Sequence, residues 1–332
     1  MTWTTAALAL LGPEPPTPLI EFPVAAPGVR LLLKDESRQP TGSLRHRHAR
    51  ALFRRAIAEG LITEGTTVVE ATGGNAAVAQ AWFARRLGLP YVVVMPGERT
   101  EARARPVEAL GGECRFVTPP LAIYDAARAL GGHFLDQFGR ATPHDLAGEL
   151  FGQVRPDWVV TGAGTGATSA GLGGWAREHG LPCRVAVADP DNSAYFPGWT
   201  LDAADYATGM PSRIEGIGRP RIEPGFRFDL VDLVIPVPDA ASVAAARRLR
   251  EVTGLPVGPS SGTALWAALE LVERLRARGE GGTVVSLIGD AAERHLATCH
   301  DDAWAAAKGL DVDRHLGTLR ERVHGPVSSE GG

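Results

Sequence analysis

A turn rich in glycine and threonine lies between a predicted strand and a predicted helix, with the sequence Gly162-Ala163-Gly164-Thr165-Gly166-Ala167-Thr168. Glycines allow several backbone N–H groups to converge on one anion, and the first turn of a helix adds partial positive charge. The threonine hydroxyls supply further donors. Ordinary connections between a strand and a helix also favour glycine, but the density and position of these residues predict a phosphate site.

A second turn, Thr72-Gly73-Gly74-Asn75-Ala76, follows a short apolar strand predicted at residues 67–70. Backbone N–H groups at the start of the next helix can bind an anion there. Taken alone, this turn is equally well explained as a glycine-containing helix start. An anion site at this turn therefore needs support from other parts of the chain.

Both turns belong to a repeated order of strand, turn and helix, which predicts an α/β fold with parallel-rich sheets. Strands are expected at 29–34, 67–70, 91–95, 114–117, 158–161, 184–188 and 283–288. Helices are expected at 46–59, 101–110, 240–253 and 263–278. Two more are expected to open at the glycine turns, one from Gly73-Gly74-Asn75 through about Leu87 and one from the turn at 162–168 through Glu178. No segment of disordered composition separates two lobes, so we expect the lobes to share strands. We expect the tail after Val323 to be flexible.

The composition limits the class of protein and its partners. With 332 residues, the chain can form two packed α/β lobes, and its net charge of -4 indicates no nucleic-acid partner. The three cysteines form no C-x-x-C pair, so we expect a reducing cytoplasm and no disulfide framework. The apolar run from Ala6 to Leu11 is too short for a membrane span, and we expect neither a signal peptide nor a metal site.

Several segments, taken in order, resemble the fold-type II pyridoxal phosphate enzymes of the cysteine synthase family, and most of all their bacterial L-cysteine desulfhydrase branch. The resemblance runs from about Thr17 to Trp304. The segments that carry it are Thr17-Pro18-Leu19, Pro40-Thr41-Gly42-Ser43-Leu44-Arg45-His46-Arg47, Thr72 to Ala76, Gln137-Phe138, Gly162 to Thr168, Asp189 to Ser193, Gly216-Ile217-Gly218 and Gly258-Pro259-Ser260-Ser261-Gly262.

The resemblance implies a two-lobed fold like that of the tryptophan synthase β subunit, working as a homodimer. A smaller, mobile α/β domain would span residues 40–146. Residues 1–39 and 147–332 would form a larger α/β domain that holds the phosphate loop. The implied activity is that of a lyase or a β-replacement transferase acting on a cysteine- or serine-like amino acid.

The same resemblance assigns roles to individual residues. The pyridoxal phosphate would be held at its phosphate by Gly164, Thr165, Gly166, Ala167 and Thr168, at its ring oxygen by Asn75 and at its pyridine nitrogen by Ser260. The amino-acid substrate would be bound by Thr72, Gly73, Gly74, Ala76, Gln137 and Gly216. Gly73 and Ala76 stand where the family has serine and threonine, so two hydroxyl donors are missing.

Arg45 departs from the family at its central chemical group. The family has a lysine at this position, which holds the cofactor as a Schiff base. A guanidinium stays protonated at any physiological pH and forms no imine. We therefore expect proton transfer to be severely slowed, or reassigned to His46 or to the amine of the substrate.

Four explanations of Arg45 remain open on the sequence alone. The chain binds pyridoxal phosphate without a covalent bond, or it is a cofactor-free lyase that uses the old pocket for another anion. Alternatively, it is a non-catalytic paralogue that binds an amino acid or phosphorylated metabolite, or it carries a deliberate Lys-to-Arg substitution that traps a ligand. Lys34, the nearest lysine in sequence, is expected to form a structural ion pair.

Overall fold

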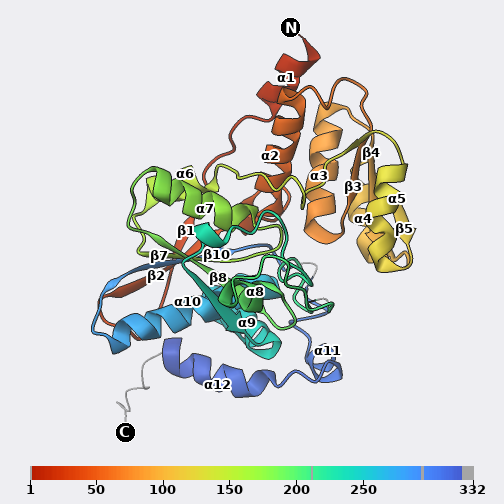
Figure 1. The fold of residues 1–332 in the computed structure, drawn as a ribbon. Helices are drawn as coiled ribbons and strands as arrows, with labels where there is room; N and C mark the ends of the chain where they lie inside the picture. The colour runs from red at the N-terminus through yellow and green to blue at the C-terminus, as the bar shows by residue number, and fades with distance from the viewer. Residues whose placement is uncertain (1, 211, 293–294, 324–332) are drawn as a thin grey trace. The chain divides into compact units, whose positions relative to one another are not determined.

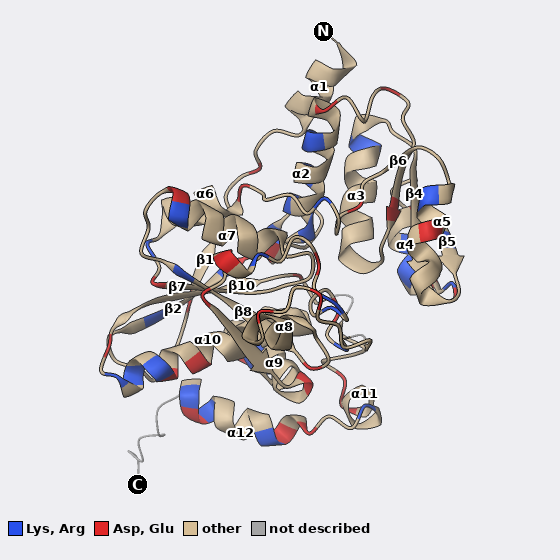
Figure 2. Ribbon diagram, in the orientation of Figure 1, with Lys and Arg blue, Asp and Glu red and all other residues tan. Residues whose placement is uncertain are grey.

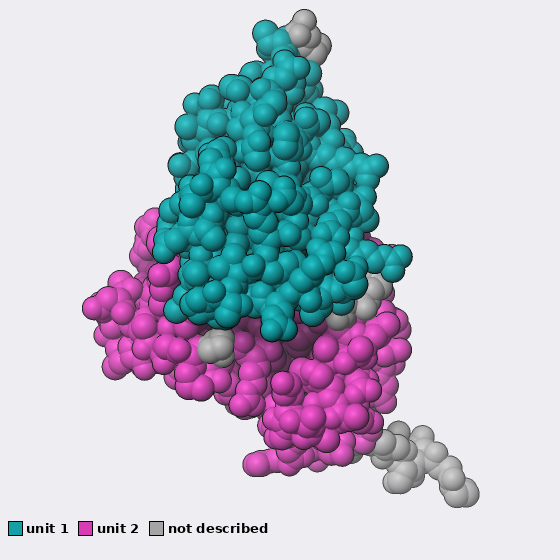
Figure 3. Space-filling view, turned by 90° about the vertical axis from the view of Figure 1, so that its right-hand side faces the viewer, with its two compact units in different colours: residues 1–16, 39–145 teal, residues 17–38, 146–332 magenta. Residues whose placement is uncertain are grey.

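The computed structural model describes residues 2–210, 212–292 and 295–323. It divides into two compact units, coloured separately in Figure 3: unit 1 comprises residues 1–16 and 39–145, and unit 2 comprises residues 17–38 and 146–332. Each unit contains its own sheet, so the expectation that the lobes share strands is wrong. The tail after Val323, for which flexibility is expected, lies outside the described residues.

Unit 1 is built around a four-stranded parallel sheet with the strand order β5-β4-β3-β6. Its strands are β3 (Val68–Ala71), β4 (Tyr91–Pro96), β5 (Glu113–Val117) and β6 (His133–Phe134). Its helices are α1 (Trp3–Leu10), α2 (Arg45–Ala58), α3 (Gly74–Leu87), α4 (Glu101–Glu108) and α5 (Ile123–Ala129), with a 3-10 turn at Pro120–Ala122.

Alternate side chains of β3 and β4 supply the two apolar cores of unit 1. Val68 and Val93 pack with α1, α2 and α3 on one face, whereas Val69 and Val94 pack with α5 on the other. Ala7 of α1 and Leu11, which follows α1, are buried in the first of these cores. This burial groups residues 1–16 with unit 1, whereas the division expected from the sequence grouped them with the larger lobe. The expected mobility of the smaller domain stays a prediction.

Unit 2 is built around a six-stranded sheet with the order β1-β2-β10-β7-β8-β9, in which only the β1–β2 pair is antiparallel. Its strands are β1 (Leu19–Phe22), β2 (Val29–Asp35), β7 (Trp158–Gly162), β8 (Arg184–Pro190), β9 (Leu233–Val237) and β10 (Gly282–Ile288). Its helices are α6 (Leu146–Gln153), α7 (Ala167–Glu178), α8 (Tyr195–Thr200), α9 (Asp239–Thr253), α10 (Pro259–Ala277), α11 (Asp302–Ala307) and α12 (Val312–Val323), with 3-10 turns at Glu36–Arg38 and Phe228–Leu230.

Helices cover both faces of this second sheet, as its near-continuous apolar strands require. Helices α9, α10 and α12 lie on one face and α6 and α7 on the other (Figure 1). Residues of both charge signs lie on α10 and α12 (Figure 2), and on α10 they form pairs such as Arg274–Glu270 and Arg276–Glu273. Among the described residues, no helix has both the length and the apolar character needed to cross a membrane.

Lys34, at the end of β2, forms the structural ion pair that the sequence predicts. Its fully buried ammonium is paired with Glu149 of α6 and donates to the carbonyl oxygen of Thr17 and to Gln153 Oε1, each at 2.7 Å. The amine therefore joins β2, α6 and the segment before β1 within unit 2. Because its ammonium is bound by these three partners, Lys34 anchors the fold of unit 2.

Replacing Lys34 with methionine should destabilise the protein by about 3–5 kcal/mol, because the Glu149 carboxylate would lose its buried partner. Urea unfolding followed by circular dichroism measures the change. Lys308→Met is the matched control, since Lys308 is exposed and should change stability by no more than about 0.5 kcal/mol. Equal stability of the Lys34 variant and the parent protein would contradict the anchoring role.

Candidate functional site

Arg45 is the first residue of α2 and is half-buried in unit 1. Burial lowers the pKa of His48 well below its usual range, and the neighbouring His144 and the Arg45 guanidinium lower it further. The pKa of His144 falls to about 3, chiefly because that side chain is also buried. Arg45 is thus a fixed cation beside two neutral imidazoles.

His46 lies in the core of unit 1. Its ring packs against Trp82 and Phe83, with centroid distances of 4.8 and 4.6 Å, and its Nδ1 lies 3.2 Å from the Thr41 hydroxyl. Burial, together with Arg50 and Arg47, lowers the pKa of His46 to about 3. Proton transfer by His46 stays a prediction, and this packed, neutral state argues against it.

The expected substrate residues of unit 1 gather at the start of α3. Thr72 and Gly73 connect β3 to α3, and Gly74 and Asn75, the latter predicted for the cofactor, open α3. These four residues are half-buried, whereas Ala76 is buried. Gln137 is brought to this turn from a distant loop, because its Nε2 donates to Thr72 Oγ1 at 2.6 Å. The structure therefore places the predicted substrate residues of unit 1 together.

Glu70, near the end of β3, holds the Gln137 loop next to the turn at Thr72. Glu70 was not identified from the sequence. Its buried carboxylate accepts from the backbone N–H groups of Ala71 at 2.8 Å and Gln137 at 3.1 Å, and from Gln80 at 3.2 Å. Burial raises the pKa of Glu70 to about 8, against the opposing effect of these donors. A carboxylate inside an apolar strand is itself a sequence signal, since glutamate is rarely fully buried without partners.

The expected phosphate loop of unit 2 lies at the start of α7. Gly166 has φ +83°, and a Cβ placed there would lie 2.4 Å from the backbone of Gly225. Tyr195, which sequence reasoning also missed, donates its hydroxyl to the Gly164 carbonyl at 2.5 Å and stacks on Phe226. These contacts from outside the loop hold its glycine backbone in place.

Two further predicted segments belong to unit 2. The loop that contains Gly216 reaches the phosphate loop, because Gly218 N donates to Ala163 O at 2.8 Å. Ser260 is half-buried in the first turn of α10, and its hydroxyl has no hydrogen-bond partner within the described residues. The adjacent Ser261 Oγ instead accepts from Gly289 N at 3.0 Å. Ser260 thus remains available to a ligand.

Within each unit, the residues present fit pyridoxal phosphate, the group that the resemblance implies, except at Arg45. The loop of unit 2 presents backbone N–H groups at a helix start, as a phosphate requires, and Ser260 offers a hydroxyl to a ring nitrogen. Asn75 lies at the start of α3 in unit 1. Arg45 supplies no amine for a covalent bond.

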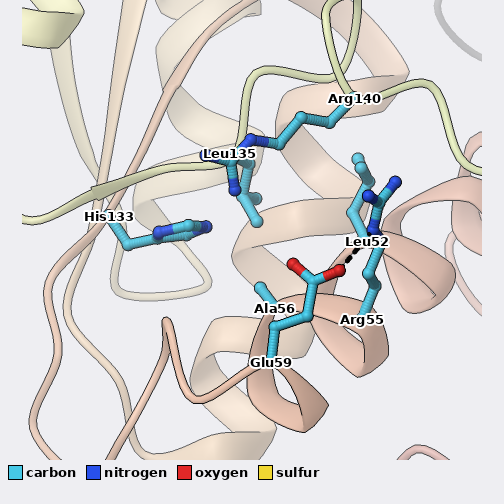
Figure 4. Close-up of a pocket in the computed structure, with 7 residues that line it drawn as sticks. All are labelled: Leu52, Arg55, Ala56, Glu59, His133, Leu135 and Arg140. Carbon is cyan, nitrogen blue, oxygen red and sulfur yellow. Dashed lines mark hydrogen bonds and ion pairs between the residues drawn. The ribbon is translucent and has the colours of Figure 1, made fainter.

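A separate pocket in unit 1 is too small to be a substrate site. It is lined by residues that include Leu52, Glu59, His133 and Arg140 (Figure 4) and encloses about 10 Å³. That is about the space for one water molecule. None of the predicted site residues lines it.

Comparison with known proteins agrees with this reading of the chain. The family model described as "Pyridoxal-phosphate dependent enzyme" matches residues 10–290. An L-cysteine desulfhydrase of Mycobacterium tuberculosis is 42% identical over 336 residues, covering 93% of this chain and 91% of that protein. A cysteine synthase of Aquifex aeolicus is 31% identical, covering 85% of this chain and 88% of that protein.

Solved structures are similar as well. The crystal structure of O-ureido-L-serine synthase superposes with a TM-score of 0.75 at 27% identity, covering 90% of this chain and 98% of that one. The fold-type II α/β architecture expected from the sequence is therefore confirmed.

Replacing Gly166 with alanine should weaken the binding of pyridoxal phosphate by about tenfold or more. The new Cβ would meet the Gly225 backbone at a φ that side chains rarely adopt, and it would displace the loop. Fluorescence titration with the cofactor measures this. Gly174→Ala, within α7, is the control, because its Cβ meets only a Leu230 methyl at 3.9 Å. Equal affinity in both variants would contradict a phosphate site here.

Glu70 should make the free energy of unfolding depend on pH. Its pKa is about 8 in the folded protein and about 4.5 for a free side chain, so the unfolded chain ionises first. Stability should therefore fall by about 1.4 kcal/mol per pH unit between those values. Glu70→Gln should remove this slope, whereas the exposed Glu108→Gln should retain it. Urea unfolding at pH 5, 6, 7 and 8 measures the slope, and an unchanged slope in the Glu70 variant would contradict the assignment.

Proposed function

We propose that this chain, which belongs to the pyridoxal-phosphate dependent enzyme family, acts on a cysteine- or serine-like amino acid as a carbon–sulfur lyase or a β-replacement enzyme. Relatives named L-cysteine desulfhydrase and cysteine synthase support this reaction class. By analogy with the family we further propose a homodimer acting in the cytoplasm.

One observation carries the proposal. The chain keeps all three kinds of cofactor-binding residue, namely the loop from Gly164 to Thr168, Asn75 and Ser260. The loop also leaves no room for a side chain at Gly166, because a Cβ there would lie 2.4 Å from the Gly225 backbone. A protein that had abandoned its cofactor would have no physical reason to retain a phosphate loop, a ring-oxygen partner and a ring-nitrogen partner together.

The manner of holding the cofactor follows from the two lysines of the whole chain. Lys34 is locked in its buried ion pair in unit 2, and Lys308 is exposed at the end of α11. Unit 1 contains no lysine at all. We therefore propose that pyridoxal phosphate is held by non-covalent contacts alone.

The residues of the chain have the following proposed roles. By the family resemblance, the loop before α7 would hold the phosphate, Asn75 would contact the ring oxygen and Ser260 would contact the ring nitrogen. Thr72, Gly74 and Gln137 bind the amino-acid carboxylate. When bound, pyridoxal phosphate withdraws electrons from the α-carbon of the amino acid and so acidifies its proton.

Arg45 determines the rate in this proposal. A guanidinium remains protonated and cannot accept the α-proton, although it can stabilise negative charge that develops nearby. Proton removal must then depend on a weaker base, such as the amine of a second substrate molecule. Turnover is accordingly far slower than in a lysine-bearing enzyme of the same family.

A second candidate is a non-catalytic protein that binds an amino acid. The observation in its favour is the absence of any lysine amine from unit 1. Binding of L-cysteine without release of sulfide, at any concentration of pyridoxal phosphate, would support it. A cofactor-free lyase would instead show turnover that does not respond to added pyridoxal phosphate.

Arg45→Lys should raise the conversion of L-cysteine to sulfide by about 100-fold or more, because it restores an amine that can exchange protons. Sulfide release in the presence of pyridoxal phosphate measures this. Arg55→Lys is the matched control, since Arg55 is exposed on the same helix and pairs with the exposed Glu59. Equal turnover by the parent protein and the Arg45 variant would contradict the proposed role of position 45.

A further inference from the structure

A guanidinium lies beside the proposed substrate turn of unit 1. A Cβ placed on Gly73 would lie 3.6 Å from Arg103 Nη2. Arg103 belongs to α4, which packs against α3 (Figure 1). The family has a serine where this chain has Gly73, so a cation approaches the point where a hydroxyl is missing.

The backbone does not explain the glycine at position 73. Gly73 has φ -141° and ψ -173°, an extended conformation that any residue adopts. Gly74, by contrast, has φ +59°, which favours glycine. A Cβ at position 73 would make an ordinary van der Waals contact with Arg103 Nη2 at 3.6 Å. With glycine at this position, no side chain of residue 73 lies between Nη2 and the backbone of the turn.

Arg103 is held firmly but is not neutralised. Its Nη1 donates to the Pro96 carbonyl at 2.7 Å and to the Glu98 carbonyl at 3.5 Å. Its guanidinium carbon lies 5.3 Å from the centre of the Phe116 ring. Within the part of the chain that the structure describes, it has no carboxylate partner, and Nη2 makes no hydrogen bond. The Arg103 guanidinium is therefore fixed in position, and it keeps its charge and its Nη2 donor for a ligand.

We propose that Arg103 is a specificity-determining residue that binds the carboxylate of the amino-acid substrate at the turn from Thr72 to Asn75. A guanidinium donates charge-assisted hydrogen bonds to a carboxylate, which are stronger than those from a hydroxyl. It thereby compensates for the two hydroxyls lost at Gly73 and Ala76. The start of α3 adds positive potential to the same turn.

This inference rests on the proposed function, which assigns this turn to an amino-acid carboxylate. It also predicts that recognition depends on the carboxylate charge of the ligand, which the family resemblance does not imply. Recognition depends on a full charge, so ligands that lack a free carboxylate should gain nothing from Arg103. Binding through Arg103 should also weaken as salt concentration rises.

The test compares two ligands, L-serine and L-serinamide, which differ only at the carboxylate. Calorimetry measures their binding to protein loaded with pyridoxal phosphate and freed of excess cofactor. The variants are Arg103→Gln, Arg103→Lys and the control Arg105→Gln, whose arginine is exposed on the same helix. Thermal unfolding checks that each variant is folded.

We expect Arg103→Gln to weaken the binding of L-serine by about tenfold to a hundredfold and to leave L-serinamide unchanged. Arg103→Lys, which keeps the charge, should restore part of the L-serine affinity, and Arg105→Gln should change neither ligand. An equal loss for both ligands, or no loss for either, would overturn the assignment and leave the proposed function intact. If the unmodified protein binds neither ligand, the proposed function fails and this inference fails with it.

Discussion

In the function that we propose, the chemistry of this chain depends on one constraint, the charge that a guanidinium at position 45 cannot give up. The lysine of related enzymes both forms a covalent bond and moves a proton, and Arg45 can do neither. The remainder of the chain offers no substitute amine. Lys34 is fully buried and joins Glu149, Gln153 and Thr17 in unit 2, where it anchors the fold.

Within each unit, the segments that we propose for binding are held by contacts from outside their own turn. In unit 2, Tyr195 and Gly225 fix the Gly164 carbonyl and Gly166. In unit 1, the Gln137 side chain donates to Thr72 and its backbone N–H donates to Glu70. Such contacts organise binding rather than proton transfer. They fit a protein that positions a cofactor and an amino acid well and that carries out the chemical step slowly.

Much of this organisation could be predicted from sequence, because it depends on local patterns. The strands and helices around the two glycine turns follow from apolar periodicity and turn residues. Contacts between distant segments could not be predicted in this way. The Tyr195 hydroxyl meets a carbonyl 31 residues away, and Gln137 meets Glu70 across 67 residues. Helix α1 likewise joined unit 1 through packing against α2 and α3 that its own sequence does not specify.

The most direct test is to add pyridoxal phosphate to the purified protein, reduce it with borohydride, denature it and measure its mass. The near-ultraviolet and visible spectrum is recorded before reduction and again after adding L-cysteine. We predict a bound-cofactor absorption band that responds to L-cysteine, and a protein mass unchanged by reduction when no amino acid is present. A mass increase by one cofactor would show covalent attachment and contradict the account, as would a spectrum with no bound-cofactor band.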